Sequence, residues 1–332
     1  MLENKWAFRI TVVSVFLAFA VILLGVTTRL KEAGLACPDW PGCYGQLIVP
    51  HQPLSSVFAG QILNPKKAWI EMIHRYAAAT LAVLALTVVI LIFKRRQLPN
   101  QPIKMAFILL SLLLLQGLLG KWTVTLHLYP LVVMAHLLGG LSLLSVLWIL
   151  IFRFIPIFNT LPTKQEKKIR LWTSIGLFVV MVQITLGGWT SSHYAAFVCP
   201  DFPRCQGHWW PIMNFSEGFN LRRDTKKSFA GGQLSSDART AIQMSHRLGA
   251  VVTALYFIFL SWKLRKISKK KTLRVISFLL LILLTLQITL GILNVIWLLP
   301  LPIAVAHNGI ATFLLLTLLT LCCYTHNNAR RK

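Results

Sequence analysis

The sequence predicts an all-α membrane protein with eight transmembrane helices, arranged as two tandem four-helix bundles, with the N and C termini in the cytoplasm. Three observations predict this fold: long apolar runs, positive charge between those runs, and an internal repeat. Of the 332 residues, 56% are hydrophobic and 13% are charged, whereas a soluble domain averages about a quarter charged residues. The composition therefore excludes an ordinary soluble domain.

Apolar runs of about 20 residues recur along the chain, each long enough to cross a bilayer core of roughly 30 Å. The first run has no small-residue cleavage site and leads into the repeat, so we interpret it as a retained helix and not a signal peptide. The expected spans are residues 8–28, 69–93, 105–126, 131–152, 170–190, 241–262, 274–298 and 303–324.

The formal net charge of +25 would indicate a nucleic-acid partner in a soluble protein. Here the basic residues gather between spans two and three, four and five, and six and seven, and at the end of the chain. The clusters are Lys94 to Lys104, Lys164 to Arg170, Lys263 to Arg274 and Arg330 to Lys332. These segments share one side of an eight-span topology, so the positive-inside rule places that side in the cytoplasm, and we expect no nucleic-acid partner.

An internal repeat divides the chain into halves. Each half has an outer loop with two cysteines six residues apart, then a helix with a His-Arg pair, and two helices later a further histidine. In chain order the motifs are CPDWPGC at 37–43, His74-Arg75, His136, CPDFPRC at 199–205, His246-Arg247 and His307. Because each repeat holds four helices, both have the same orientation, and we expect units over residues 1–160 and 161–332.

The two outer loops differ in length. From the second cysteine to the His-Arg pair the spacing is 31 residues in the first half and 41 in the second. The extra residues follow Trp209-Trp210-Pro211 and are rich in glycine and serine near Gly231-Gly232-Gln233.

Four cysteines lie on the outer, oxidising side of this topology. Two cysteines six residues apart, separated by prolines that bend the chain, can close a small disulfide loop. A redox-active pair and a metal site are the alternatives, although neither loop has a Cys/His quartet. We expect disulfides between Cys37 and Cys43 and between Cys199 and Cys205.

Four histidines lie at one depth, each about five residues into a helix that starts on the outer side. A lone histidine in a membrane helix more often forms a hydrogen bond between helices, but four at equal depth, paired within a repeat, indicate ligands. Zinc would need three or four converging donors, whereas two facing imidazoles in an apolar site suit the axial positions of a haem. The expected pairs are His74 with His136 and His246 with His307.

The arginine after the first histidine of each half, Arg75 or Arg247, lies one residue deeper. We expect it to pair with haem propionates, and the alternative is a snorkelling charge.

One difference between the halves concerns chemistry. Glu71 precedes His74 by three residues and shares its helix face, whereas Gln243 stands at the matching place before His246. A carboxylate in a membrane helix is costly and is usually functional, and beside a haem it can accept a proton or stabilise positive charge. The asymmetry indicates that the first half is reactive and that the second holds a spectator or electron-carrying haem.

Together, the Glu-x-x-His-Arg motif at 71–75, the second His-Arg pair, the later histidines, the paired cysteines and the duplication resemble the haem A synthase family. The resemblance covers about residues 8–325. It implies oxidation of the C8 methyl group of haem O to a formyl group, with water as the oxygen source, giving haem A for terminal haem-copper oxidases.

The resemblance also implies particular roles. Haem O would lie between His74 and His136, with Glu71 as the catalytic carboxylate, and haem b would be held by His246 and His307. The implied partners are a haem O synthase upstream, a membrane electron acceptor of the quinone type and a further copy of the chain in a homo-oligomer, in a bacterial cytoplasmic membrane. The competing hypotheses are a non-catalytic di-haem b-type electron carrier and a transporter with internal repeats.

Overall fold

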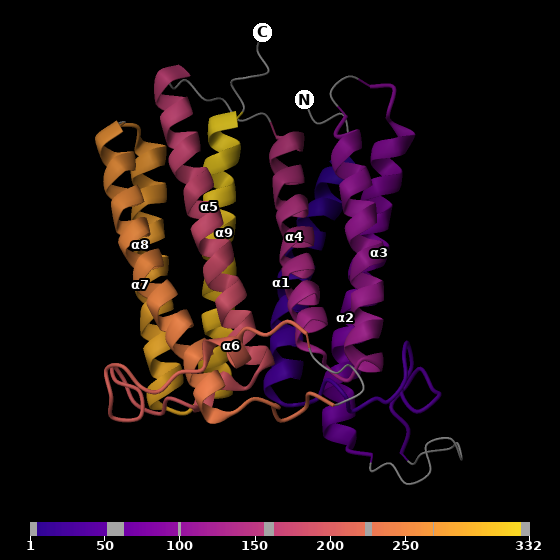
Figure 1. Cartoon of the computed structure of the whole chain (residues 1–332). Helices are drawn as coiled ribbons and strands as arrows, with labels where there is room; N and C mark the ends of the chain where they lie inside the picture. The colour runs from indigo at the N-terminus through magenta and orange to yellow at the C-terminus, as the bar shows by residue number, and fades with distance from the viewer. Residues whose placement is uncertain are drawn as a thin grey trace. The chain divides into compact units, whose positions relative to one another are not determined.

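The computed structural model describes residues 5–51, 63–98, 101–155, 163–222, 228–267 and 269–326, and within these ranges the regular structure is helical (Figure 1). The α-helices are α1 (Lys5–Leu30), α2 (Pro65–Lys94), α3 (Ile103–Thr125), α4 (Pro130–Phe154), α5 (Thr163–Ser192), α6 (Phe215–Gly218), α7 (Ser236–Ile267), α8 (Lys271–Ile296) and α9 (Leu301–His326). A short 3₁₀ helix, η2, covers Ala195–Phe197.

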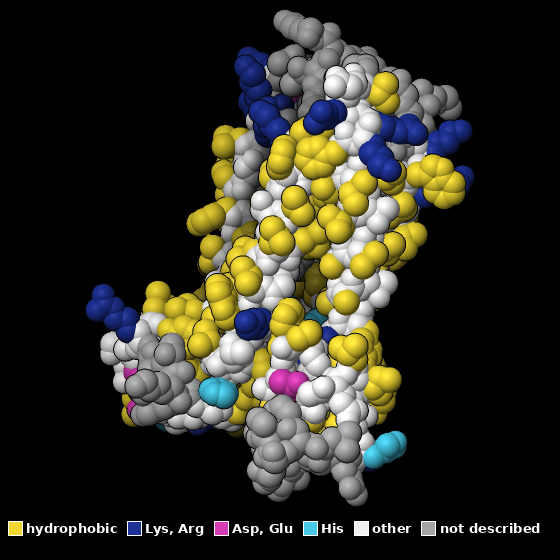
Figure 2. Space-filling view, turned by 90° about the vertical axis from the view of Figure 1, so that its right-hand side faces the viewer, with side chains coloured by type: hydrophobic (Ala, Val, Ile, Leu, Met, Phe, Trp, Pro, Cys, Tyr) yellow, Lys and Arg dark blue, Asp and Glu magenta, His cyan; other side chains and the backbone are white. Residues whose placement is uncertain are grey.

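Eight helices of the described part are long and apolar enough to cross a membrane, namely α1 to α5 and α7 to α9. The eight predicted spans are therefore confirmed. The helices α5 and α7 extend several residues beyond the predicted apolar runs, because lysine, arginine and glutamate continue a helix outside the bilayer as readily as leucine does within it. Hydrophobic side chains cover the sides of the helices, and lysine and arginine gather at one end (Figure 2).

The chain forms two compact units. The first contains α1 to α4, in which α1 packs against α2 and α4, and α3 packs against the same two helices. The second contains α5 to α9, in which α5 packs against α7 and α9, and α8 also packs against α7 and α9. Each unit is thus a closed ring of four long helices with the same order of neighbours.

The repeat extends to the backbone of the turns. Between α3 and α4, His127 and Leu128 have φ angles of +48° and +64°, and between α8 and α9 Leu298 and Leu299 have +53° and +63°. The N–H of Leu128 donates to the carbonyl of Thr123 at 2.9 Å, which closes the end of α3. Residues with side chains rarely adopt positive φ, so the shared conformation is a specific feature of both units.

A segment of the longer outer loop, Leu221–Gln233, belongs to the first unit although it lies in the second half of the sequence. The hydroxyl of Tyr129 donates to the Leu221 carbonyl at 2.9 Å, and the N–H of Phe229 donates to the His127 carbonyl at 3.1 Å. The rings of Tyr129 and Phe229 meet edge to face, with centroids 5.4 Å apart. The segment therefore fastens onto the turn that leads into α4.

Candidate functional site

The start of α2 places the expected reactive residues. Asn64 caps this helix by accepting a hydrogen bond from the N–H of Lys67 at 3.2 Å, and Pro65 occupies the first turn, where its missing N–H costs nothing. Glu71 and His74 then follow in the second and third turns, three residues apart on neighbouring positions of one helix face.

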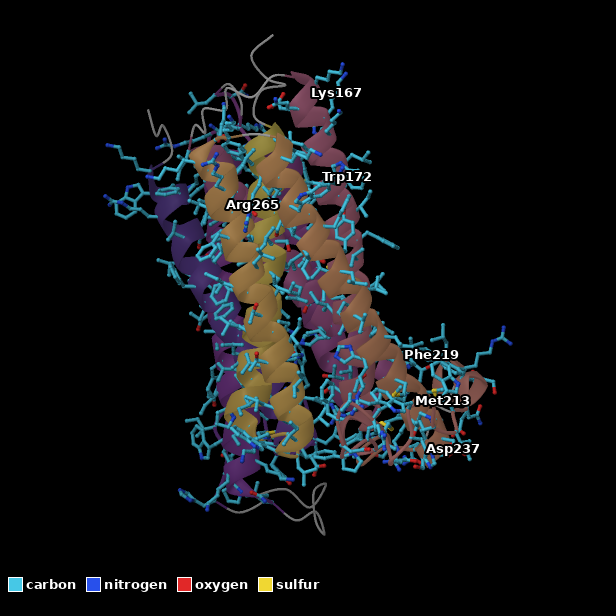
Figure 3. All side chains as sticks on the ribbon, turned by 90° about the vertical axis from the view of Figure 1, so that its left-hand side faces the viewer. Lys167, Trp172, Met213, Phe219, Asp237 and Arg265 are labelled. Atoms are coloured by element: carbon cyan, nitrogen blue, oxygen red, sulfur yellow. A yellow bond between two sulfur atoms is a disulfide. The ribbon has the colours of Figure 1, made fainter. Side chains whose placement is uncertain are left out.

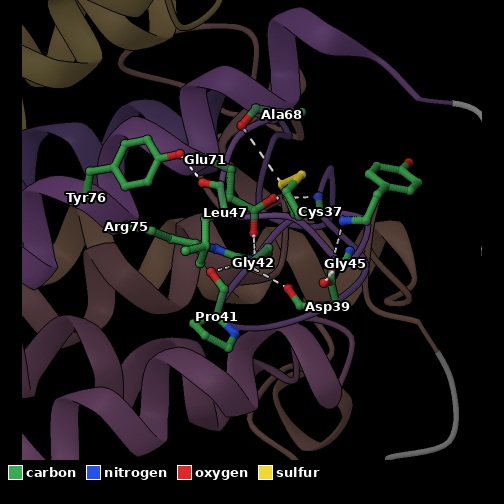
Figure 4. The surroundings of a disulfide bond; sticks show 12 residues. Cys37, Asp39, Pro41, Gly42, Gly45, Leu47, Ala68, Glu71, Arg75 and Tyr76 are labelled. Carbon is green, nitrogen blue, oxygen red and sulfur yellow. Dashed lines mark hydrogen bonds and ion pairs between the residues drawn. A yellow bond between two sulfur atoms is a disulfide. The ribbon is translucent and has the colours of Figure 1, made fainter. Parts of the chain in front are cut away.

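Glu71 is buried, with 4% of its surface exposed. One carboxylate oxygen, Oε2, accepts from the main-chain N–H of Cys37 at 2.9 Å, and the other, Oε1, accepts from Nη2 of Arg75 at 2.5 Å (Figure 4). Because a buried carboxylate is stable only when it is paired and hydrogen-bonded, these two contacts fix its position between α2 and the outer loop.

Arg75 connects the helix to the disulfide loop. Its second terminal nitrogen, Nη1, donates to the carbonyls of Asp39 at 2.8 Å, Pro41 at 3.2 Å and Gly42 at 2.5 Å. A guanidinium has five donors in a rigid fork, which allows one side chain to hold Glu71 and the loop together (Figure 4).

The second unit repeats this arrangement without the carboxylate. Nη1 of Arg247 donates to the Arg204 carbonyl at 2.8 Å, and Nη2 donates to the carbonyls of Asp201 at 2.9 Å and Cys199 at 3.3 Å. Gln243, at the place of Glu71, is buried, and its Oε1 has no hydrogen-bond partner among the described residues. The hydrogen bonds of Arg247 among the described residues are therefore with main-chain carbonyls of the disulfide loop.

Both predicted disulfides are present. Cys37 bonds to Cys43 and Cys199 to Cys205, with a Cα–Cα distance of 4.7 Å in each pair, while Cys322 and Cys323 are free. All four bonded cysteines are fully buried, so each disulfide lies inside its loop and cross-links it.

An aspartate inside each disulfide loop binds the turn that follows. In the second loop, Asp201 accepts from the N–H of Gln206 at 2.6 Å and from that of Gly207 at 2.8 Å. Slight burial raises the pKa of Asp201, but these two N–H donors and the charge of Arg247 outweigh it, so the pKa lies below its usual value. Figure 3 shows the loop end of this unit around Met213, Phe219 and Asp237, far along the helices from Lys167 and Arg265.

The histidines lie against glycines of neighbouring helices. A Cβ atom added at Gly25 would be 3.0 Å from Cε1 of His74, and one at Gly120 would be 3.5 Å from Cε1 of His136. His74 of α2 lies near enough to His136 of α4 to influence it electrostatically. The first unit therefore brings the predicted pair together, from α2 and α4.

The second unit brings its own pair together from α7 and α9. Added Cβ atoms at Gly187 and Gly291 would be 3.0 Å from Cε1 of His246 and 3.1 Å from Cε1 of His307, and His307 lies near enough to His246 to influence it electrostatically. The small residues let each imidazole pack closely against the backbone of the neighbouring helix.

This donor set fits a haem better than zinc. Within the described residues, no group of three or more His, Cys, Asp or Glu side chains could hold a metal ion, which zinc would need. Each unit instead offers two half-buried imidazoles, and Nδ1 of His74, His136 and His307 is buried without a hydrogen-bond partner among the described residues. Two facing imidazoles match the axial positions of a haem iron.

Sequence reasoning missed what the arginines and one glutamine contact. Arg75 and Arg247 both bind loop carbonyls, and Arg75 also binds Glu71, while their pairing with haem propionates stays a prediction. Gln183 on α5 was also missed, and its Nε2 lies 3.0 Å from Nδ1 of His246. A signal was present, because the equivalent position of the first repeat, four residues before Gly25, is Val21.

The fold and the site define a class: a duplicated, multi-pass membrane protein with one histidine pair in each four-helix unit. Comparison with known proteins agrees. Residues 8–319 match the model of the cytochrome oxidase assembly protein family, COX15-CtaA, and this chain belongs to that family.

Three relatives of this chain are each named heme A synthase. The chain is 44% identical to a heme A synthase of Shewanella oneidensis, with 96% of each chain covered. It is 25% identical to a heme A synthase of Rickettsia felis, with 95% of each covered, and 24% identical to one of Shouchella clausii, with 97% of this chain and 96% of that protein covered.

Proposed function

We propose that this protein is a haem A synthase, a membrane oxidoreductase that converts the C8 methyl group of haem O to a formyl group. The observation that carries the proposal is the carboxylate of Glu71, buried beside His74 in one unit, where the otherwise matching second unit has Gln243. The 44% identity to a heme A synthase across the chain supports the same reaction.

The first unit is the substrate site of this proposal. Haem O is bound between His74 and His136, with its reacting methyl group toward Glu71. Oxidising a methyl group to a formyl group with water releases four electrons and four protons, so positive charge develops at the reacting carbon as electrons leave. A fixed carboxylate stabilises that charge or accepts a proton, and Arg75 with the Cys37 N–H keeps it in place.

The second unit holds the cofactor. His246 and His307 are the proposed ligands of a haem b, which supplies a path for electrons. A quinone-type acceptor in the membrane takes the electrons onward, and a haem O synthase supplies the substrate. The basic ends of the helices are proposed to face the cytoplasm, because positive charge is retained on that side. In a bacterium this membrane is the cytoplasmic membrane.

The test compares wild-type protein with Glu71→Gln, which keeps the shape of the side chain and one of its two acceptor oxygens and copies the residue of the second unit. Purified proteins in lipid nanodiscs receive haem O and an electron acceptor, and extracted haems are separated and identified by mass. A lost acid-base or electrostatic group lowers the rate by roughly 10²–10⁴-fold, so haem A formation should nearly stop.

The matched control is Gln243→Glu, which places a carboxylate at the equivalent position of the other unit and should leave the product unchanged. Haem b content, read from the reduced-minus-oxidised spectrum, must be the same in all three proteins. Formation of haem A by Glu71→Gln within about threefold of wild type, far below the range for such a group, would show that the carboxylate takes no part in the reaction, and absence of haem A from the wild-type reaction would leave a di-haem electron carrier as the better account.

A further inference from the structure

A cavity opens at the basic end of the second unit, between α7 and α8. Its volume is about 430 Å³, and it is lined by Arg265 of α7 and by Arg274 and Phe278 of α8. Ligand cavities in proteins commonly measure about 300–1,000 Å³. Arg265 lies near the end of the helices opposite Met213 and Phe219 (Figure 3), so the cavity is separate from the histidine site.

Arg265 is held in place through one of its three nitrogens. Its Nε donates to the hydroxyl of Ser277 at 2.8 Å, and that hydroxyl donates to the Ser261 carbonyl at 3.0 Å. Ser277 is fully buried, so this chain of hydrogen bonds joins α7 to α8. The terminal nitrogens of Arg265 have no hydrogen-bond partner among the described residues, and a guanidinium fork fits the oxygens of a phosphate.

The positive charge around the cavity has no acidic partner. Neither Arg265 nor Arg274 forms an ion pair with a described residue. Two like charges that line one cavity repel each other, and an anion bound between them removes that repulsion. The lining therefore favours an anionic ligand.

The lining changes from charged to apolar along the helices. Arg274 stands in the first turn of α8, and Phe278 follows on the same face about 6 Å further into the apolar part of the helix. Phe278 is exposed, and so is Trp262, three residues before Arg265, and tryptophan is typical of the headgroup level of a bilayer. A phospholipid has the same order, with its phosphate at the headgroup level and its acyl chains deeper.

The first unit has an aromatic contact in place of this cavity. The repeats are aligned on the His-Arg pairs and on Gly120 and Gly291. The counterparts in the first unit are then Phe93 for Arg265, Ile103 for Arg274, Ala106 for Ser277 and Phe107 for Phe278. The rings of Phe93 and Phe107 meet edge to face, with centroids 5.0 Å apart. The fold therefore does not require two arginines and a buried serine at this place.

We propose that the second unit binds the phosphate group of an anionic phospholipid between Arg265 and Arg274, with an acyl chain along Phe278. Basic pockets between membrane helices on the cytoplasmic side recognise such headgroups, and the basic ends of these helices are proposed to face the cytoplasm. Ser277 is a positioning residue that orients Arg265. The bound lipid joins the last turn of α7 to the first turn of α8, and it goes beyond the haem chemistry proposed above.

The test is photo-crosslinking in nanodiscs of phosphatidylcholine that contain a small fraction of phosphatidylglycerol with a diazirine on one acyl chain. Mass spectrometry should locate the label on the peptide around Phe278. Added unlabelled phosphatidylglycerol should lower the labelling, whereas inorganic phosphate should not. Competition by inorganic phosphate would assign the cavity to a soluble ion, and equal labelling by a phosphatidylcholine probe would show that charge is not recognised. Either result would overturn the proposal.

Two double variants with the same change in net charge separate a specific site from general attraction. Arg265→Gln with Arg274→Gln should lower labelling about tenfold or more, because each basic residue near an anionic lipid is worth roughly fivefold in binding. Lys269→Gln with Lys271→Gln removes the same charge from exposed residues outside the lining and should leave labelling within about twofold, well short of the effect of two contacts. Equal losses in both would contradict a site.

Ser277→Ala tests the orientation of Arg265 while every charge is kept, and it copies Ala106 of the first unit. Immobilising a long side chain on binding lowers affinity by roughly threefold or more, so labelling should fall by about that factor. This variant also tests the site if the double arginine variant fails to fold, as judged by gel filtration and bound haem. Labelling equal to wild type would rule out the positioning role. No turnover is needed, so the outcome is independent of the Glu71 experiment.

Discussion

Arg75 binds Glu71 through Nη2 at 2.5 Å, while the equivalent nitrogen of Arg247 binds loop carbonyls, one of them that of Cys199 at 3.3 Å. The two arginines occupy the same place in their repeats and hold the same kind of loop. The second unit has Gln243 where the first has Glu71, so Arg247 has no carboxylate to pair with at that position. Its Nη2 donates to main-chain carbonyls of the loop instead. Arg75 thus couples the Glu71 carboxylate to the first disulfide loop, and the second unit has the same kind of loop without a carboxylate.

Arg75→Lys should loosen the first disulfide loop, because an ammonium cannot reproduce the forked contacts of a guanidinium. A hydrogen bond to a charged group is worth about 1.5–3 kcal/mol, so the loop should open about tenfold more often or more. The measurement is the rate at which a membrane-impermeant reductant cleaves Cys37–Cys43, followed by mass mapping of alkylated thiols. Arg247→Lys is the control, and it should accelerate cleavage of Cys199–Cys205 alone. Equal acceleration of both disulfides in either variant would contradict the coupling.

Thiol labelling of the native protein should modify at most Cys322 and Cys323, which are the free cysteines of the described residues. The other four should react only after reduction and denaturation, because they are bonded and fully buried. Labelling at Cys37 or Cys199 without reductant would show that the loops are open in the resting protein.

His246→Ala and His307→Ala should each remove the haem b signal from the reduced-minus-oxidised spectrum, because a site with two imidazole ligands loses its ligand field when one is missing. His74→Ala is the matched variant of the first unit and should keep that signal while losing substrate haem. An unchanged haem b spectrum in either second-unit variant would show that haem b is bound at another site.

Acid should weaken the second disulfide loop. The folded-state pKa of Asp201 lies below its usual value because the N–H groups of Gln206 and Gly207, with the charge of Arg247, outweigh slight burial. The contribution of this group to stability is therefore fully present above the unfolded pKa of about 3.9 and is lost as pH falls through the folded pKa.

The measurement is cleavage of Cys199–Cys205 by a phosphine reductant between about pH 2 and 7, a window that spans the usual aspartate pKa. Wild type should react faster at the acid end, whereas Asp201→Asn should be fast and nearly independent of pH. The difference should be at most about fivefold, since an exposed charge interaction is worth about 1 kcal/mol or less. A pH profile shared by both proteins would exclude Asp201 as the cause.

The helices and the disulfides follow from the sequence because both obey simple constraints. A bilayer core fixes the length of an apolar run, and six-residue spacing on an oxidising side closes a small loop. The contacts of Arg75 with the first disulfide loop could not be predicted from the sequence, because the positions of main-chain carbonyls depend on how the loop folds. Gln183 was hidden for another reason: a single glutamine in an apolar helix carries no meaning until it is compared with Val21 and placed beside His246.

The position of Leu221–Gln233 in the first unit has a consequence for biosynthesis. The ribosome completes α1 to α4 long before it reaches this segment, so the first unit cannot obtain the contacts of Tyr129 with Leu221 and Phe229 until most of the chain exists. A gene cut between the repeats would therefore separate the first unit from a part of itself. The two repeats therefore form one interdependent translation product, in which the first unit is completed by a segment made after α5 and before α7.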